Sequence, residues 1–98
     1  MRVVWTASAR RDLEAIWSWI AQDNPAAADR VDEDILVAGE SLAAMPRRGR
    51  TGRLAGTREL IVTGRPYLLV YVVRDEGVAI LRIIHMARDW PGARPRQP

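Results

Sequence analysis

The second half of the chain contains three apolar runs whose boundaries predict antiparallel strands. Residues 57–62, 67–74 and 78–86 are rich in Val, Ile, Leu and Tyr, and a Thr-Gly-Arg-Pro segment and an Asp-Glu-Gly segment separate them. Branched and aromatic residues between such turn-forming segments are typical of strands. The middle run is apolar at every position from Tyr67 to Val73, so we expect a central strand that is covered on both faces.

The third apolar run carries an arginine among aliphatic residues. Successive side chains of a strand point to opposite faces. Leu81 and Ile83 should therefore share one face and be buried between the sheet and the helices. The opposite face should hold Ile80, Arg82 and Ile84. Arg82 is then either a rim residue with its stem packed and its head in water, or a cation held on a concave sheet face for an anionic partner.

The first half of the chain predicts an opening strand and a helix. Residues 1–5 form a short apolar run, and Thr6 or Ser8 can cap the helix that follows. Apolar side chains then recur at helical spacing and predict one buried stripe. This stripe consists of Ala9, Leu13, Ile16, Trp17 and Ile20. Trp19 lies off the stripe, either as rim packing or as the mark of a contact surface.

A second helix follows a sharp Asp-Asn-Pro break. Asn24 can cap it, and Pro25 suits the first helical position, where its missing N–H costs nothing. The helical spacing continues to about Ala44. Its apolar stripe consists of Ala28, Val31, Ile35, Ala38, Leu42 and Met45. Two helices joined so tightly form an antiparallel hairpin.

Together these elements predict an α+β fold in a single domain spanning residues 1–98. The N-terminal strand and the three-strand antiparallel meander should form one sheet, with the antiparallel helical hairpin packed on it. A chain of 98 residues is long enough to bury a core without disulfides or metals. Residues 91–98 are rich in proline and should be a mobile tail, whereas Trp90 should fold back as a packing anchor.

Charge is segregated along the chain, although the net charge is only +3. Residues 23–40 carry six acids against one arginine, a sum of −5, and residues 47–65 carry six arginines against one acid, a sum of +5. Such a field steers an acidic partner toward the basic region. Residues 47–56 hold four arginines and three glycines without an acid, which indicates a solvated loop or a basic, flexible lip suited to phosphate or an acidic peptide.

The composition limits the chemistry that the chain can perform. Cysteine is absent and His85 is the single histidine, which excludes disulfides, thiolate sites and multi-histidine metal sites. The sequence contains no membrane span and no signal peptide, so we expect a cytoplasmic protein without a membrane partner. It also contains no nucleotide-binding, zinc-protease or serine-hydrolase motif, so we expect neither a cofactor nor a metal. His85 should face away from Arg82, and a lone histidine at a strand end is more often structural. The residues alone favour a binding protein over an enzyme.

In their order, the short motifs of this chain resemble the RelE/ParE toxin family over nearly the whole length. The matching stretches are Trp5-Thr6 with Ala9 and Asp12-Leu13, Asn24 to Ala27, Pro46, Gly49-Arg50, Gly56–Leu60 (GTREL), Pro66–Tyr71 (PYLLVY), Ile80–His85 (ILRIIH) and Trp90-Pro91. The resemblance implies the toxin of a type II toxin–antitoxin pair, a small basic α+β protein that a cognate acidic antitoxin neutralises.

The resembled family divides by activity. RelE-like members are ribosome-dependent mRNA endoribonucleases, and ParE-like members poison DNA gyrase. The RNase members carry a central-strand arginine where this chain has Leu68, and the GTREL and PYLLVY stretches are more ParE-like. The resemblance therefore implies a ParE-like inhibitor of gyrase. The alternatives are a RelE-like RNase with Arg82 and His85 as catalytic residues, and an inactive member that only binds antitoxin.

The ParE-like interpretation assigns no catalytic residue. Candidates for contact with the antitoxin or the target are Arg50, Arg53, Arg58, Arg82, Trp19 and Trp90. DNA gyrase is the implied target, and the ribosome and mRNA are partners only in the RelE-like alternative.

Overall fold

The computed structural model of the protein describes residues 1–88, so Trp90 and the predicted tail at 91–98 lie outside the described residues. Its elements are β1 (Arg2–Trp5), α1 (Ala7–Ala21), α2 (Pro25–Glu40), the 3-10 helix η1 (Ser41–Ala43), β2 (Arg50–Thr51), β3 (Arg58–Ile61), β4 (Tyr67–Arg74) and β5 (Gly77–His85). The predicted α+β class is confirmed. Among residues 1–88, no helix is both long and apolar enough to cross a membrane.

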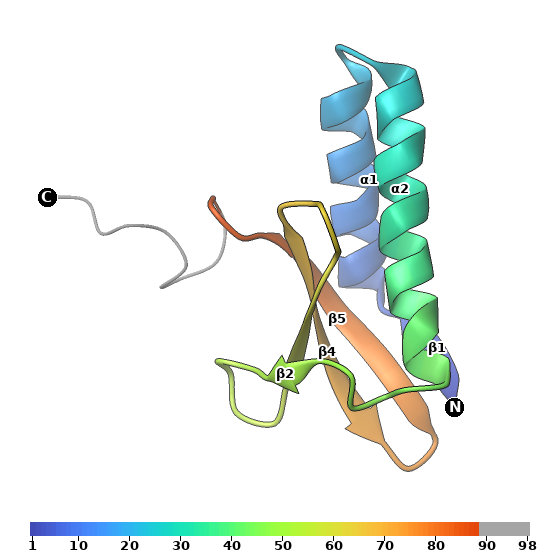
Figure 1. Cartoon of the computed structure of the whole chain (residues 1–98), viewed down its shortest axis with the longest axis vertical. Helices are drawn as coiled ribbons and strands as arrows, with labels where there is room; N and C mark the ends of the chain where they lie inside the picture. Colours follow the sequence, from blue (N-terminus) through green and yellow to red (C-terminus); the bar gives the residue numbers. More distant parts are fainter. Residues whose placement is uncertain (89–98) are drawn as a thin grey trace, which may run out of the picture.

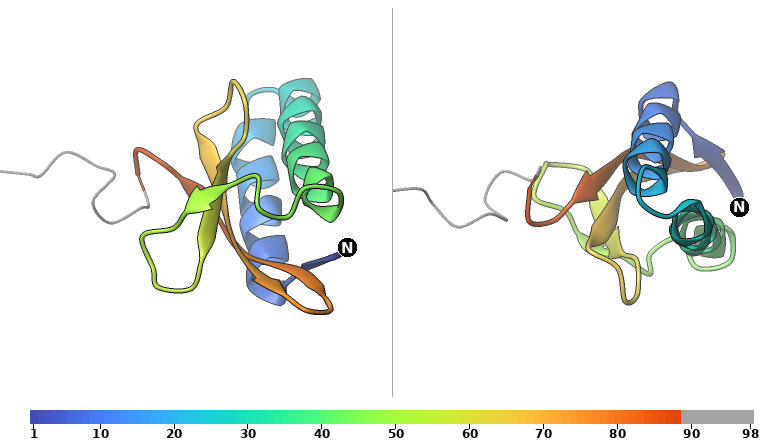
Figure 2. Two further views of the ribbon diagram at one scale, coloured as in Figure 1. Left: turned by 60° about the horizontal axis from the view of Figure 1, so that its bottom comes forward. Right: turned by 90° about the horizontal axis from the view of Figure 1, so that it is seen from above.

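One five-stranded sheet has the strand order β1-β5-β4-β3-β2. The predicted meander is confirmed, since β3, β4 and β5 pair antiparallel, and the opening strand joins it as a parallel partner of β5. The helices run side by side on one face of the sheet (Figures 1 and 2). The two-residue strand β2 pairs antiparallel with β3 and was not predicted, because residues 47–56 carry no apolar pattern.

Side-chain caps begin both helices where the sequence predicts them. The Thr6 hydroxyl accepts the Ala9 N–H at 3.2 Å, and the Asn24 side chain accepts the Ala27 N–H at 3.0 Å. The second helix ends earlier than predicted, at Glu40. The Ser41 hydroxyl donates to the Ala38 carbonyl at 2.6 Å, and this competing bond favours the tighter 3-10 turn that follows.

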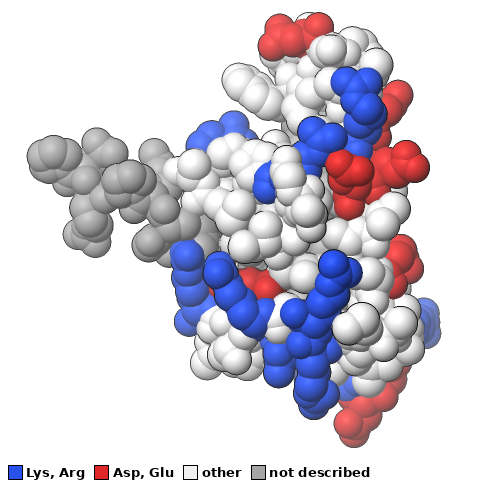
Figure 3. Space-filling view, viewed as in Figure 1, with Lys and Arg blue, Asp and Glu red and all other residues white. Residues whose placement is uncertain are grey.

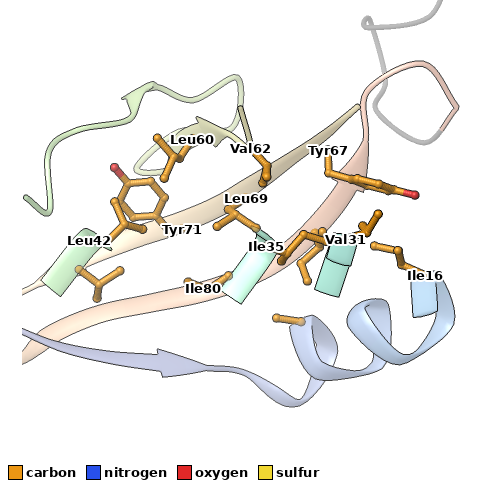
Figure 4. Packing of buried hydrophobic residues seen from close by; sticks show 13 residues of the cluster. Ile16, Val31, Ile35, Leu42, Leu60, Val62, Tyr67, Leu69, Tyr71 and Ile80 are labelled. Carbon is orange, nitrogen blue, oxygen red and sulfur yellow. The ribbon is translucent and has the colours of Figure 1, made fainter. Parts of the chain in front are cut away.

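The main hydrophobic core lies between the helical hairpin and the sheet (Figure 4). Ile35 of α2, Leu42 of η1, Leu69 of β4 and Ile80 of β5 are fully buried there. Helical spacing of 3.6 residues and strand spacing of two bring these residues to facing surfaces. Two residues of the predicted stripes are exceptions: Trp17 is 39% exposed and Met45 is 60% exposed.

Both exceptions have a structural reason. Trp17 lies at the rim of the hairpin, where its indole N–H donates to Asp29 Oδ1 at 2.9 Å. If the ring were buried in the core, the indole N–H would lose this acceptor. Met45 follows η1, where the chain leaves the helical path on which the spacing depends.

The central strand β4 is covered on both faces, as predicted, over residues 67–71. Tyr67, Leu69 and Tyr71 face the helices. Leu68 and Val70 face the other way and form a second, smaller cluster with Ile84 and Met86. The surface opposite the helices is called the outer face below.

The predicted faces of Ile80 and Leu81 in β5 are wrong because the strand contains a bulge, whereas those of Ile83, Arg82 and Ile84 are confirmed. Val70 pairs with Arg82 and Tyr71 with Ile80, so Leu81 is an extra residue without a partner. The extra residue brings Ile80 and Ile83 to the same face, in the helix-side core, and leaves Leu81 only half-buried. Strict alternation had placed Leu81 in that core and Ile80 beside Arg82.

Candidate functional site

A row of four paired positions crosses the outer face from β2 to β5. Arg50 pairs with Glu59, Glu59 with Val70, and Val70 with Arg82. Side chains at directly paired positions lie on the same face of a sheet. The structure therefore brings two predicted site residues, Arg50 and Arg82, to the two ends of one row.

Glu59 is the buried acid of this row and organises its β2 end. Its side chain is 1% exposed, and Arg50 donates to Glu59 Oε1 from Nη2 at 3.1 Å and from Nε at 3.3 Å. The Arg53 backbone N–H donates to Glu59 Oε2 at 2.9 Å. A buried carboxylate is tolerated only with such partners. The sequence pattern does not reveal this role, and its one signal is that Glu59 is the single acid among the arginines of residues 47–65.

Arg82 is held at the other end of the row by an acid from the first helix. Its Nε donates to Asp12 Oδ2 at 2.7 Å, and its Nη2 donates to Asp12 Oδ1 at 3.1 Å. Asp12 Oδ2 also accepts the Ile83 N–H at 2.9 Å. Strand β1 ends at Trp5, which pairs with Ile80, so Asp12 takes over the hydrogen bond that a longer edge strand would supply. Arg82 remains half exposed at the rim and is ion-paired there.

A hollow of about 190 Å³ between α1 and β5 adjoins this ion pair. Trp19, Arg82 and Arg88 contribute to its wall, together with the apolar residues Ala15 and Ile16. Trp19 is 61% exposed. Two predicted contact residues, Trp19 and Arg82, thus share one concave surface.

The arginine-rich segment between η1 and β3 is tied to the fold. The Gly49 N–H donates to the buried Tyr71 hydroxyl at 2.8 Å, and a Cβ on Gly49 would lie 2.6 Å from that oxygen. Arg58 Nη1 donates to the Gly49 carbonyl at 2.7 Å and to the Arg47 carbonyl at 3.5 Å. The predicted flexible lip is therefore partly a short strand, and Arg58 contributes to holding it.

Surface charge is distributed as the sequence indicates. Arginines gather over β2 and the neighbouring loops, and acids lie along the α2 side of the same view (Figure 3). On α2, partial burial raises the pKa of Asp32 above its ordinary value of 3.8, and the nearby charge of Asp29 adds to this rise. Among residues 1–88, no group of three or more acids or histidines could hold a metal ion.

His85 and Leu68 bear on the possibility of catalysis. His85 pairs with Tyr67, and their rings meet edge to face at 5.3 Å between centroids. Its Nδ1 accepts the Ala87 N–H at 3.3 Å. Because Tyr67 faces the helices and Arg82 pairs with Val70 on the outer face, the predicted opposite orientation of His85 and Arg82 is confirmed. Leu68 is fully buried in the outer-face cluster.

Known proteins similar to this chain in sequence are toxins of one family. Residues 3–90 match the sequence profile of the ParE toxin of the type II toxin–antitoxin system parDE. The chain belongs to the RelE/ParE toxin family. This chain is 46% identical over 87 residues to toxin RelE2 of Caulobacter vibrioides, a match that covers 89% of this chain and 97% of that one.

Further relatives span the same length. Putative toxin Y4kP of Sinorhizobium fredii is 40% identical over 90 residues, covering 92% of this chain and 93% of its own length. A chain from the chromosomal ParDE TA system of P. aeruginosa superposes with a TM-score of 0.80 at 27% identity, covering 87% of this chain and 95% of that one. This RelE/ParE-family chain is thus a toxin of the type II toxin–antitoxin class, and the family resemblance predicted from its motifs is confirmed.

Proposed function

We propose that this toxin acts in the ParE-like manner, by inhibiting DNA gyrase in the cytoplasm, and that a cognate acidic antitoxin neutralises it. The observation that carries this proposal is that, within residues 1–88, the outer face holds no unpaired arginine at either end of its row. Both arginines at the ends of its row are paired with carboxylates of the same chain, at 3.1 Å for Arg50 and 2.7 Å for Arg82.

RNA cleavage requires cations at the developing phosphorane and a group that moves protons. Leu68, which stands where the RNase members place an arginine, is buried and uncharged. His85 packs on Tyr67 at the helix-side face, away from Arg82. Arginine stays protonated and is a poor proton acceptor. These residues support binding of a protein target better than catalysis.

The antitoxin part of the proposal rests on charge and on the solved relative. The similar P. aeruginosa chain comes from a ParDE toxin–antitoxin system. In this chain, residues 47–65 carry a net charge of +5. An acidic, partly aliphatic antitoxin segment would complement this region and the hollow beside Trp19. Salt-dependent association kinetics of an Arg53→Glu variant test the electrostatic part, since rim charges mainly alter the association rate.

Induced expression in a bacterial host tests the proposed target. A gyrase inhibitor should induce the DNA damage response while protein synthesis continues at first. Co-expression of a cognate antitoxin should suppress that response. Immediate loss of translation without a DNA damage response would contradict the proposal.

The RelE-like alternative keeps one specific point in its favour, because toxin RelE2 is a relative at 46% identity. In that case Arg82 and the loop arginines would bind mRNA on the ribosome. A reconstituted translation reaction, mapped by primer extension, separates the two functions. New codon-positioned 5′ ends that disappear in Arg82→Ala would establish the alternative, and a member that only binds antitoxin would show neither activity.

A further inference from the structure

The two arginines of the outer-face row share an arrangement that their distance in the sequence conceals. Each is bonded to a carboxylate that is less exposed than itself: side-chain exposure is 53% for Arg50 against 1% for Glu59, and 52% for Arg82 against 18% for Asp12. In each pair the acid is therefore the more deeply buried partner. A ligand that approaches the outer face meets arginines whose charge is already compensated from within.

The same donor atoms are used in both pairs. Arg50 binds Glu59 through Nε and Nη2, and Arg82 binds Asp12 through Nε and Nη2. This edge of the guanidinium is one of the forks with which arginine grips a phosphate through two parallel hydrogen bonds. A carboxylate on the fork removes both the donors and much of the positive potential that attracts a nucleic-acid backbone.

We infer that Asp12 and Glu59 are specificity-determining residues that keep the outer face from binding nucleic-acid phosphates. The inference deepens the proposed function and rests on it in one respect, since a toxin that acts on a protein must not be captured by the RNA and DNA around it. Asp12 and Glu59 thus act as positioning residues for Arg82 and Arg50, and they leave the face to a protein partner.

Removing the negative charge while keeping an oxygen acceptor tests this role. In Asp12→Asn the side-chain amide oxygen can still accept the Ile83 N–H, and in Glu59→Gln it can still accept the Arg53 N–H. Glu14→Gln and Glu76→Gln are matched controls, because each raises the net charge equally at an exposed position of the chain. Circular dichroism and thermal melts of the full chain identify the variants that fold.

The readout is the affinity for a fluorescent single-stranded oligouridylate, measured by anisotropy between about 50 and 200 mM salt. Each arginine released to contact a phosphate should steepen the dependence of log K on log salt by about 0.7. Between 200 and 50 mM salt, a slope steeper by this amount raises the affinity at the lower salt concentration by a further factor of about three. The control variants should shift the affinity by less and leave the slope close to that of the unaltered protein.

A double variant links the gain to the arginine. Adding Arg82→Gln to Asp12→Asn should remove the gain in oligonucleotide affinity that Asp12→Asn produces. In the otherwise unaltered protein, the same Arg82→Gln change should lower the affinity by a smaller factor. The inference is overturned if the folded variants bind like their controls or if the gain survives Arg82→Gln. It is also overturned if neither Asp12→Asn nor Glu59→Gln folds, since the acids then serve the fold alone. A free oligonucleotide reports on this role without gyrase, so its outcome is separate from that of the proposed target.

Discussion

Replacing Gly39 with alanine should destabilise the protein, although alanine is the better helix former. Gly39 lies in α2 against the ring of Trp5, the last residue of the first strand. A Cβ at this position would lie 2.3 Å and 2.4 Å from two ring carbons of Trp5, and 2.9 Å from Cδ1 of Ile80. Carbon atoms in non-bonded contact lie about 3.5–4.0 Å apart. Glycine is required here by space rather than by its backbone freedom.

The surroundings decide the sign of the change. The Trp5 ring is held by its indole N–H, which donates to Glu40 Oε2 at 2.9 Å, and Ile80 is fully buried. Neither neighbour can retreat freely, so α2 must move away from β1. Overpacking of this kind costs about 1–3 kcal/mol, whereas alanine in a helix interior gains about 1 kcal/mol over glycine. With three close contacts at one methyl group, we expect a net loss of about 1–2 kcal/mol.

Urea denaturation followed by circular dichroism measures this loss, and for a domain of this size the melting temperature should fall by about 4–16 °C. The Trp5→Ala background provides the matched control. Once the ring is absent, only the contact with Ile80 at 2.9 Å remains, so Gly39→Ala should cost clearly less than it does in the parent protein. A Gly39→Ala protein as stable as the parent, or the same effect in both backgrounds, would refute the packing of Trp5 against α2.

Three further predictions concern the core and the charges. Tyr71→Phe should cost about 1–3 kcal/mol in urea denaturation, because it leaves the buried Gly49 N–H without an acceptor; an unchanged midpoint would show that this bond is dispensable. Ile80→Ala should cost about 2–5 kcal/mol and Leu81→Ala clearly less, since Ile80 is fully buried and Leu81 is the half-buried bulge residue; the reverse order in thermal melts would restore strict alternation. Because the pKa of Asp32 is raised in the folded state, its protonated form is favoured there, and stability falls as the pH rises through that pKa. Asp32→Asn should therefore raise the melting temperature at about pH 7 and give no advantage at about pH 3, and a lower melting temperature at neutral pH would contradict the sign.

Local rules predicted much of the fold. Thr6 and Asn24 cap the helices as their side-chain chemistry indicates. Strand β4 has the predicted boundaries, because turn residues flank an uninterrupted apolar run. The predictions failed where a local signal is lacking. Strand β2 is two residues long and has no periodicity, and the bulge at Leu81 interrupts an alternation that the apolar residues around it do not reveal.

The candidate site depends on pairs that sequence spacing does not show. Arg82 was correctly identified as an unusual charge in a strand, but its partner Asp12 lies 70 residues earlier, in α1. In the sequence Glu59 is one negative charge among arginines, whereas in the fold its buried carboxylate binds Arg50 and the backbone N–H of Arg53. Such pairing follows from sheet register and from the point at which β1 ends, and both are properties of the assembled fold.

We expect this toxin to act on gyrase rather than on mRNA. The most direct measurement incubates the purified toxin with DNA gyrase, ATP and supercoiled plasmid, and quantifies cleaved DNA after denaturation of the enzyme. If the toxin inhibits gyrase, cleaved DNA should accumulate with increasing toxin, the cognate antitoxin should prevent this, and messages in a parallel translation reaction should stay intact. Uncleaved plasmid together with codon-positioned cuts in the message would contradict this expectation.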